Sequence, residues 1–250
     1  MTGILYLIPN LLSPPDASNA EQLTASIPTE VQRLTATLDY FIAENAKTAR
    51  AYLKLIAQKT PLAVPLQQIL IHELNVNTPT SRLPELLAPL LAGRHAGLIS
   101  EAGVPAVADP GADLVRLAHQ QMIAVRPMVG PSSLLLAVMA SGLNGQSFAF
   151  NGYLPVDASQ RTKRIKTLED RSRQEQQTQL FIETPYRNLP LLEALLATCQ
   201  AATLLCVAID LTTHNEQIIT RTTAQWKHLM KTSAMPDLQK KPAVFLLLAQ

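Results

Sequence analysis

Short apolar runs alternate with longer segments of helical spacing through the first part of the chain. Apolar runs rich in Ile, Leu, Val and Phe predict buried strands, whereas apolar positions three and four apart predict helices packed on one side. The predicted strands span 4–8, 39–43, 68–74, 95–99 and 123–129, and periodicity alone leaves a helix open at 68–74. The predicted helices span 28–38, 45–57, 81–91, 111–121 and 131–141.

Several helix ends carry their own signals. Pro28 stands where a first helical turn tolerates proline. Ser81 is suited to cap the helix that follows it, and Gly93 to close that helix. Residues 13–19 (SPPDASN) predict a turn-rich loop between the first strand and the first helix.

Alternation of strand and helix predicts parallel β-α-β units with helices on both faces of one sheet. Such sheets bind ligands beyond the carboxyl ends of their strands. The loops that follow Ile8, Ile99 and Val129 are therefore the places to look for chemistry.

The second half of the chain has a different order. Strands are predicted at 147–150, 179–183, 203–209, 216–221 and 243–248, and helices after a loop at 151–160, at 187–198 and at 223–231. Two strand runs follow one another without a helix, which predicts a mixed sheet. Gly142 and Gly145 interrupt the pattern near 144–146. The sequence therefore predicts two α/β domains, 1–145 with a parallel sheet and 146–250 with a mixed sheet.

Composition narrows the class of protein. Among 250 residues, 47% are hydrophobic and 16% charged, enough apolar material for a large core and too much for a disordered chain. A formal charge of +2 is too small to indicate a nucleic-acid partner, so any RNA would need a local basic surface. Cys199 and Cys206 have no histidine at metal-ligand spacing, which favours buried, reduced thiols and no metal site.

Nothing in the sequence predicts a membrane segment. Its amino-terminal stretch lacks a basic region and reaches proline before a signal-peptide core is complete. Apolar runs such as 134–140 and 243–249 are far shorter than the roughly 20 residues that cross a bilayer. We therefore expect a soluble, cytoplasmic protein.

Two loops have compositions suited to ligands. Residues 100–111 (SEAGVPAVADPG) combine glycine, proline and small side chains after a predicted strand, which lets main-chain groups approach a ligand. Residues 130–134 (GPSSL) place two hydroxyls at a helix start, suited to a polar ligand group. Taken alone, each loop is equally consistent with a simple turn or helix cap.

Seven motifs that follow one another along the chain are more specific than either loop alone. They are YLIP (6–9), AEN (43–45), the loop 100–111, GPSSLLLAVMASGL (130–143), FAFNGYLP (148–155), FIETPYR (181–187) and VAIDLTTHNE (207–216). Together they resemble the tetrapyrrole methylase superfamily, closest to its branch of small-subunit ribosomal RNA ribose 2'-O-methyltransferases, the methyltransferase I type. The resemblance covers nearly the whole chain.

The resemblance implies a homodimer that binds S-adenosylmethionine (SAM) in a cleft between the two domains. Carried over by position, the SAM-binding residues would be Pro9, Gly103, Val104, Val107, Ser132 and Ser133 in the first part of the chain, and Ile182, Ala208, Pro242 and Ala243 in the second. A G-x-G-x-x-G nucleotide motif is absent from the sequence.

The chain also departs from the branch. Asn45 stands where Asp is usual, Ile209 where Arg is usual, and Thr184 to Arg187 replace Ser-Pro-His-Arg. The first loop reads Asn-Leu-Leu-Ser-Pro from residue 10 in place of Thr-Pro-Ile-Gly-Asn-Leu. Donor-side motifs are better preserved than acceptor-side ones, so the departures bear on the substrate more than on the fold.

Methyl transfer from a sulfonium is an in-line displacement, so much of the catalysis comes from positioning. A ribose hydroxyl benefits from a base or an oriented acceptor. The candidates are Glu44, Glu183, Tyr186 and Arg187, with Glu101 also in a predicted loop. Each has a plainer explanation: Glu183 and Arg187 are four apart and suited to an ion pair, Glu44 to capping the next helix, and Glu101 to solvation.

Residues 161–173 (RTKRIKTLEDRSR) are dominated by Lys and Arg. They predict either a solvated helix face or a contact with the phosphates of ribosomal RNA or the small ribosomal subunit. Three functions follow from the resemblance: a methyltransferase in ribosomal RNA processing, a methyltransferase for a tetrapyrrole-like small molecule, or a degenerate relative that binds SAM without transferring methyl.

Overall fold

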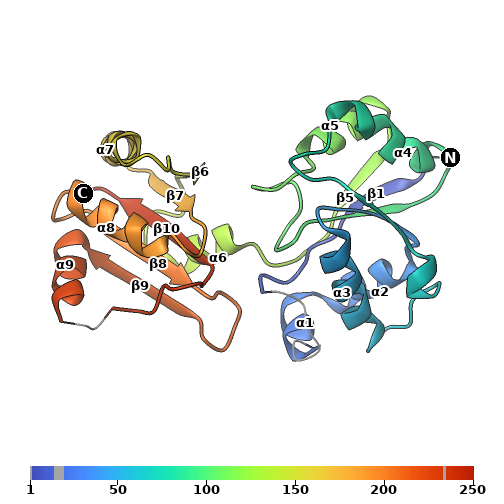
Figure 1. Cartoon of the computed structure of the whole chain (residues 1–250), viewed down its shortest axis with the longest axis horizontal. Helices are drawn as coiled ribbons and strands as arrows, with labels where there is room; N and C mark the ends of the chain where they lie inside the picture. Colours follow the sequence, from blue (N-terminus) through green and yellow to red (C-terminus); the bar gives the residue numbers. More distant parts are fainter. Residues whose placement is uncertain (1, 14–19, 233–234) are drawn as a thin grey trace. The chain divides into compact units, whose positions relative to one another are not determined.

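The computed structural model divides the chain into two compact units, Met1–Ser132 and Ser133–Gln250 (Figure 1). The structure describes residues 2–13, 20–232 and 235–250. The turn-rich loop predicted at 13–19 lies, apart from Ser13, outside the described residues. Each unit has its own sheet and its own buried core, and each is described by itself below.

The first unit is built on a five-stranded parallel sheet with strand order β3-β2-β4-β1-β5. Its strands are β1 (Ile4–Leu7), β2 (Tyr40–Ala43), β3 (Leu70–Glu73), β4 (Ala96–Ile99) and β5 (Ala124–Pro127). All four pairings are parallel, and Tyr6 lies opposite Gly97 between β1 and β4. The parallel sheet is confirmed, and the ambiguous segment at 68–74 contains a strand.

Helices cover both faces of this sheet, and the alternation of side chains along β2 shows how. Phe41 belongs to a core formed with α1 (Ala20–Ser26), α2 (Thr29–Thr37) and α3 (Ala46–Ala57). Its neighbours Tyr40 and Ile42 point to the opposite face, into a core formed with α4 (Leu83–Leu91) and α5 (Ala112–Gln120). The Tyr40 hydroxyl donates a hydrogen bond to the Leu86 carbonyl in α4, 2.9 Å away. A strand buried on both faces reads as a continuous apolar run, as the sequence does here.

Local signals explain most helix ends in this unit, and one prediction is wrong. Gly93 has a φ of 96° and donates to the Leu90 carbonyl, closing α4 as expected. Ser81 does not cap α4, because it lies inside a short 3-10 helix (Thr80–Arg82), and Arg82 at the cap makes no side-chain cap bond. Helix α1 was not predicted, because its seven residues bury few side chains and show no helical period.

The second unit has a mixed five-stranded sheet with order β6-β7-β10-β8-β9. Its strands are β6 (Phe148–Tyr153), β7 (Thr178–Ile182), β8 (Leu204–Ile209), β9 (Gln217–Thr222) and β10 (Ala243–Leu248). Strands β6 and β7 are parallel, whereas β10 runs antiparallel to both β7 and β8. The predicted mixed sheet is confirmed. Strand β6 extends to Tyr153, into the predicted loop, through a shift in register after Phe150.

Three helices cover one face of the second sheet, and one covers the other. Helices α7 (Ala158–Glu175), α8 (Asn188–Thr198) and α9 (Thr223–Lys231) enclose the main core of this unit. Trp226 of α9 is fully buried there and donates its indole N–H to the Leu205 carbonyl at 2.8 Å. Helix α6 (Ser133–Ser141) lies on the opposite face, where the Thr220 hydroxyl donates to the Ser141 carbonyl at 2.7 Å (Figure 1).

Helix α6 explains why the observed division lies earlier than the predicted one. The sequence predicts the boundary after residue 145, at the glycines that interrupt the pattern. The structure groups residues from Ser133 onward with the second unit. An apolar helix joins the sheet that it covers, and the hydrogen bond between Thr220 and Ser141 ties α6 to β9. Hydropathy by itself does not say which of two sheets a helix covers.

Within the part of the chain that the structure describes, no helix is long and apolar enough to span a bilayer.

Gly130 gives a direct test of the packing in the first unit. A methyl group at Gly130 would lie 2.1 Å from Cβ of Pro9, which is buried, so the backbone must shift. We expect Gly130→Ala to destabilise the protein by about 1–3 kcal/mol, the usual cost of overpacking. Urea unfolding monitored by circular dichroism measures this change.

Gly145→Ala is the matched control. Its added methyl would lie 3.6 Å from Val138 Cγ1, an ordinary contact, so its stability should change little. Equal stability of the two variants would contradict the close approach of Pro9 and Gly130.

Candidate functional site

The loops at the carboxyl ends of sheet strands β1 and β4 are joined by one buried side chain. Asn10, in the loop that follows β1, is fully buried. Its side-chain amide donates to the carbonyls of Ser100 and Glu101, both at 3.1 Å, and its carbonyl oxygen accepts from Leu11 N at 2.8 Å. Its main-chain N–H donates to the Gly103 carbonyl at 2.8 Å, and Gly103 N donates back to Leu11 O at 3.3 Å. These bonds fix the start of the loop 100–111.

Glu44 makes a second connection to the same loop. Its carboxylate accepts from Glu101 N at 3.1 Å, and Thr48 donates its hydroxyl to the Glu101 carboxylate at 3.2 Å. Helix α3 is capped by Asn45, whose side-chain oxygen accepts from Lys47 N and Thr48 N. Glu44 therefore holds the loop and does not cap the helix. Asn and Asp are equally good caps, so the departure at Asn45 preserves this role.

Close backbone contacts bring three predicted SAM-binding positions together. Gly130 packs against Pro9, and a methyl group on Gly103 would lie 3.4 Å from the Pro131 carbonyl oxygen. Ser132 follows Pro131 directly. Pro9, Gly103 and Ser132 thus lie at one edge of the first sheet, where the loops after β1, β4 and β5 meet.

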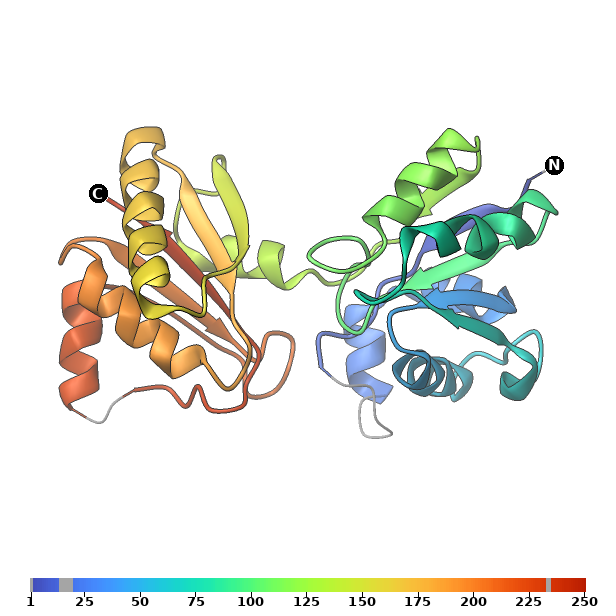
Figure 2. The same ribbon diagram turned by 45° about the horizontal axis from the view of Figure 1, so that its top comes forward.

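The loop 100–111 carries concentrated backbone strain. Gly103 and Gly111 have positive φ values of 68° and 132°, and the non-glycine residues Ala106 and Ala108 have φ of 66° and 65°. Left-handed backbone at residues with a side chain costs free energy and persists only where surrounding structure enforces it, often at functional sites. Val107, between the two alanines, is 47% exposed. This loop lies beyond the ends of the strands, drawn in green in Figure 2.

Asp109 is a residue of this loop that the sequence analysis did not select. Burial, together with the nearby charges of Glu44 and Glu101, raises the pKa of its carboxyl to about 6, although a hydrogen bond with the Ser100 side chain acts to lower it. A carboxyl group with a pKa close to neutral is suited to proton transfer. Its signal in the sequence is its place in a glycine-rich loop, where an aspartate is equally consistent with a turn.

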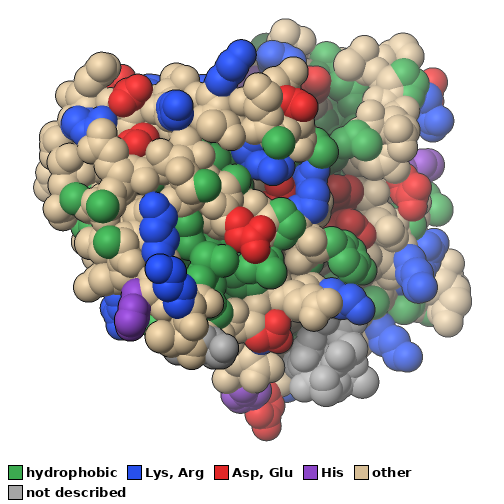
Figure 3. All heavy atoms as spheres, turned by 60° about the vertical axis from the view of Figure 1, so that its left-hand side comes forward, with side chains coloured by type: hydrophobic (Ala, Val, Ile, Leu, Met, Phe, Trp, Pro, Cys, Tyr) green, Lys and Arg blue, Asp and Glu red, His purple; other side chains and the backbone are tan. Residues whose placement is uncertain are grey.

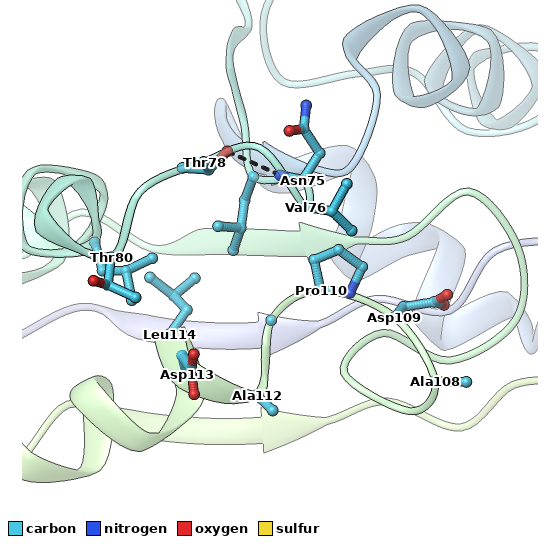
Figure 4. Close-up of a pocket in the computed structure, with 13 residues that line it drawn as sticks. Asn75, Val76, Thr78, Thr80, Ala108, Asp109, Pro110, Ala112, Asp113 and Leu114 are labelled. Atoms are coloured by element: carbon cyan, nitrogen blue, oxygen red, sulfur yellow. Dashed lines mark hydrogen bonds between the residues drawn. The ribbon is translucent and has the colours of Figure 1, made fainter. Parts of the chain in front are cut away.

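A hollow of about 460 Å³ lies beside Asp109 in the first unit. One wall is the segment after β3, and the other is the end of the loop 100–111 with the first turn of α5. Figure 4 shows Val76, Thr80, Pro110 and Leu114 around a common space, with the Asp109 carboxylate on the far side of Pro110 from Leu114. Neither Gly103 nor Val104 lines this hollow.

In the second unit, two of the predicted SAM-binding residues are in register with the same residue of the central strand β10. Ile182 and Ala208 each lie opposite Val244 of β10, so their side chains point to the same face. This face is the one that α6 covers, as the bond from Thr220 shows. Ala243 lies in register with Ile209, and both side chains belong to the core under α7, α8 and α9. Pro242 is exposed. Sheet alternation therefore separates Ala243 from Ala208.

The four predicted catalytic residues are divided between the two units, with Glu44 in the first and the other three in the second. Glu183 and Arg187 form an ion pair at 2.6 Å, and the same Glu183 oxygen accepts from Thr184 N at 2.7 Å. The Glu183 side chain is only 1% exposed, so its carboxylate is committed to these contacts. Tyr186 in the same turn is 77% exposed. Glu44 belongs to the first unit. The geometry supports the pairing interpretation for Glu183 and Arg187.

The loop after β8 also has left-handed backbone at residues that carry side chains. Asp210 and Thr212 have φ of 50° and 68°. Asp210 N donates to the Pro242 carbonyl at 3.1 Å, and the Asp210 carboxylate lies 3.6 Å from Lys241 Nζ. Ile209, which replaces the usual Arg, is buried in the helix-covered core. An apolar side chain fits that environment without a partner, which a guanidinium would need.

Both cysteines lie in environments that make their thiols unreactive. Cys199 and Cys206 are free and buried, and burial raises the pKa of Cys199 to about 12 and also raises that of Cys206. Such thiols are inert at neutral pH. Among the residues that the structure describes, no group of three or more His, Cys, Asp or Glu side chains could hold a metal ion.

Helix α7 separates its charges along its length. Its second half has acidic partners: Arg171 pairs with Glu175 at 3.1 Å, and Arg173 with Asp170 at 3.2 Å. In its first half, Lys163 and Lys166 are exposed, three residues apart. Figure 3 shows Lys and Arg side chains of this face with acidic ones between them near the top of the view. The available positive charge therefore lies at the amino-terminal half of α7.

Arg161 and Arg164 flank the exposed lysines but bind elsewhere. Arg161 donates to the Val156 carbonyl at 3.1 Å, and Arg164 donates to the Asn151 side chain at 3.0 Å. Neither contact neutralises charge. The first half of α7 and the adjoining end of β6 form one basic surface, which we call the α7 basic surface (Arg161, Lys163, Arg164, Lys166).

Comparisons with known proteins bear on the fold. No family model matches the chain. Among solved structures, a uroporphyrin-III-C-methyltransferase from Thermus thermophilus matches 99% of this chain and 93% of its own, with a TM-score of 0.53 and 18% identity. The methyltransferase CobJ matches 99% and 95%, with a TM-score of 0.59 and 18% identity. At this identity the likeness shows the fold.

Relatives that are similar in sequence identify the family, whereas the solved structures identify only the fold. A protein named ribosomal RNA small subunit methyltransferase I from Synechocystis sp. is 31% identical over 231 residues, 92% of this chain and 72% of that protein. The protein of the same name from Streptococcus pyogenes serotype M1 is 33% identical over 189 residues, 74% of this chain and 57% of that protein. A third, from Mesorhizobium japonicum, is 43% identical over 104 residues, 42% of this chain.

The chain thus spans between about half and three quarters of the length of these first two relatives. The motif resemblance, the two-unit fold and the relatives agree with one another. The chain belongs to the ribosomal RNA small subunit methyltransferase I family of methyltransferase enzymes, and it has the tetrapyrrole methylase fold.

Proposed function

We propose that the protein transfers a methyl group from SAM to a ribose hydroxyl of small-subunit ribosomal RNA, acting in the cytoplasm as a homodimer. The observation that carries this proposal is the meeting of three loops at the strand ends of the first unit. There the segments that contain Pro9, Gly103 and Pro131, from three different loops, pack against one another, and all three residues are buried. The family relatives are named for ribosomal RNA.

SAM supplies an electrophilic methyl group on a positively charged sulfur. The chain's own task is to hold that group against the acceptor oxygen, since placement accounts for a large part of the rate enhancement in such displacements. The bonds of Asn10 fix the loop 100–111 before any ligand arrives. Preorganisation of this kind lowers the entropic cost of binding. Contact of SAM with Ile182, Ala208 and Pro242 of the second unit stays a prediction.

The structure adds no support for either alternative function, a small-molecule methyltransferase or a relative that binds SAM without transferring methyl. The small-molecule alternative rests on neighbours that share only the fold. The degenerate alternative rests on departures at Asn45 and Ile209. Asn45 still caps α3, and Ile209 is part of a well-formed core. These two departures are compatible with an intact protein, which supports retained activity.

The α7 basic surface supports an RNA partner over a small molecule. A cationic surface without local acidic partners attracts phosphates and releases their counterions. The absence of interleaved aromatic side chains in 161–173 favours contact with the RNA backbone over stacking on bases.

Methyl-labelled SAM tests the proposal against both alternatives. The protein is incubated with small ribosomal subunits that lack the modification and, separately, with a small-molecule extract. We expect label in the ribosomal RNA, at a site that resists alkaline cleavage because a 2'-O-methyl group removes the attacking hydroxyl. Label confined to small molecules would support the tetrapyrrole-like alternative. Binding of SAM in calorimetry with no transfer would support the degenerate one.

Asn10→Ala tests the preorganised loop. The variant leaves the carbonyls of Ser100 and Glu101 without this donor, and the loss at the buried Ser100 carbonyl should cost about 1–3 kcal/mol. We expect the Kd for SAM to rise by at least about tenfold, the equivalent of about 1.4 kcal/mol. Isothermal calorimetry measures the affinity, and Asn215→Ala in an exposed loop of the second unit is the control. An unchanged affinity in Asn10→Ala would argue against SAM binding at this loop.

Charge reversal tests the α7 basic surface. The double variant Lys163→Glu, Lys166→Glu should weaken ribosomal RNA binding and reduce the slope of log affinity against log salt by about 0.7–0.9 for each phosphate that the variant no longer binds. Lys227→Glu, Lys231→Glu makes the same charge change on α9 of the same unit. Equally weakened binding in both double variants would show that only net charge matters. SAM affinity should stay unchanged in either.

A further inference from the structure

One face of helix α3 carries only positive charge. The helix contains Lys47, Arg50 and Lys54 and has no Asp or Glu. Residues three and four apart lie on the same side of a helix, so these three cations share one face. All three are exposed, whereas Tyr52 and Ile56 on the other side are buried in the core of the first unit. We call the exposed face the α3 basic surface (Lys47, Arg50, Lys54).

The cations of the α3 basic surface have no acidic partner. None of the ion pairs or side-chain hydrogen bonds among the described residues includes any of the three. Other cations of the first unit are paired. Their pairs are Arg33 with Glu30, Arg82 with Glu85, Arg94 with Asp39 and Arg116 with Asp113. The charge on α3 is therefore available to a ligand.

The stability of α3 does not explain this arrangement. Like charges three and four residues apart repel one another, and a helix face that serves only solvation gains from opposite charges at that spacing. The helix dipole favours acids in the first turn, but Lys47 stands in the first turn of α3, which has no acid there. An anionic partner explains the three cations better than the helix itself does.

Helix α3 begins beside the loop on which the proposed SAM site depends. The Glu44 carboxylate accepts from Glu101 N at 3.1 Å, and Thr48 in the first turn of α3 donates its hydroxyl to the Glu101 carboxylate at 3.2 Å. Between these contacts in the sequence stands Lys47. From there the surface extends by about 10 Å along the helix to Lys54, at about 1.5 Å per residue.

The carboxylates near the first turn are held by other groups. Glu73 accepts from Ala46 N at 3.0 Å, and Glu44 and Glu101 make the contacts described above. Each of these acids therefore has a main-chain or hydroxyl donor and leaves Lys47 unpaired. Because carboxylates repel phosphate, an anionic chain is favoured along the length of α3 and disfavoured at the acidic start of the loop 100–111.

We propose that the α3 basic surface binds phosphates of the ribosomal RNA substrate, beside the loop 100–111. The inference rests on the proposed function and adds to the α7 basic surface a second RNA contact, in the unit that contains the loop. Three cations spread over about 10 Å match a chain of repeating phosphates better than a single small anion. The one aromatic side chain of α3, Tyr52, is buried, so the contact is with the RNA backbone and not with stacked bases.

Neutralising the three cations tests this contact. The triple variant Lys47→Gln, Arg50→Gln, Lys54→Gln keeps residues of similar helix propensity, so α3 should stay folded. We expect the Kd for unmodified small ribosomal subunits to rise at least about tenfold, and the slope of log affinity against log salt to fall by about 0.7–0.9 for each phosphate no longer bound. The Kd for SAM in calorimetry should not change.

The matched control removes the same charge from other helices of the same unit. It is the triple variant Arg33→Gln, Arg82→Gln, Arg116→Gln, whose side chains are 63%, 56% and 69% exposed. Exposed ion pairs contribute little to stability, so this variant should fold. It should bind RNA as the wild type does. Equal weakening in both triple variants would mean that only net charge matters and would overturn the inference.

Lysine acetylation tests the surface in the wild-type protein. Exposed amines react with acetic anhydride unless a ligand covers them, and mass spectrometry locates the modified residues. We expect ribosomal RNA to protect Lys47 and Lys54 and to leave the exposed Lys227 and Lys231 of α9 reactive. Equal modification of Lys47 and Lys54 with and without RNA would overturn the inference even if the triple variant on α3 did not fold.

Failure of this inference and failure of the proposed function give different results. A wild-type protein that neither binds nor methylates ribosomal RNA overturns both. A wild-type protein that methylates RNA, with the α3 triple variant binding RNA as tightly as its control, overturns only the contact at α3. Unchanged RNA binding with a changed size in gel filtration would assign the α3 basic surface to a contact between copies of the chain, and would also overturn the inference.

Discussion

The side-chain amide of Asn10 is the contact on which the candidate site depends. It lies fully buried after β1 and uses its N–H groups on two carbonyls of the neighbouring loop and its oxygen on Leu11 N. A loop whose carbonyls are held in this way has given up its conformational entropy before any ligand binds. The strain at Ala106 and Ala108 persists because the loop is anchored at both ends: Asn10 holds its start, and its last residue, Gly111, accepts the first helical hydrogen bond of α5 from Val115.

The departures from the family pattern are explained by the environments in which they lie. Asn45 caps α3 as an aspartate would, and Ile209 points into an apolar core. Glu183 and Arg187 satisfy one another in a turn where a buried carboxylate needs a partner. Each of these side chains has the hydrogen-bond partner, the ion-pair partner or the apolar surroundings that it needs. The departures at Asn45 and Ile209 are therefore compatible with a folded chain.

The distribution of charged side chains in this protein is more informative than its net charge. A net charge of +2 predicts little about partners, but α7 pairs the cations of its second half with acids and leaves Lys163 and Lys166 exposed in its first half. Acid is likewise concentrated at the strand ends of the first unit, where Glu44, Glu101 and Asp109 lie. The exposed lysines of α7 and the clustered carboxylates are thus found in different units.

The sequence by itself determined the strands, nearly all the helices and the parallel and mixed character of the two sheets, because these follow from the local periodicity of apolar residues. It also placed Pro9, Gly103 and Ser132 in loops that meet, since the ends of parallel strands share one edge. It did not find α1, misplaced the cap of α4, and could not show that α6 covers the second sheet. Tertiary structure alone decided that Asn10 is a tether, that Ala243 and Ala208 face opposite ways, and that Asp109 is half-buried among other acids. Those properties depend on which side chains lie nearby in space, and residues such as Asn10 and Ser100 are 90 positions apart in the chain.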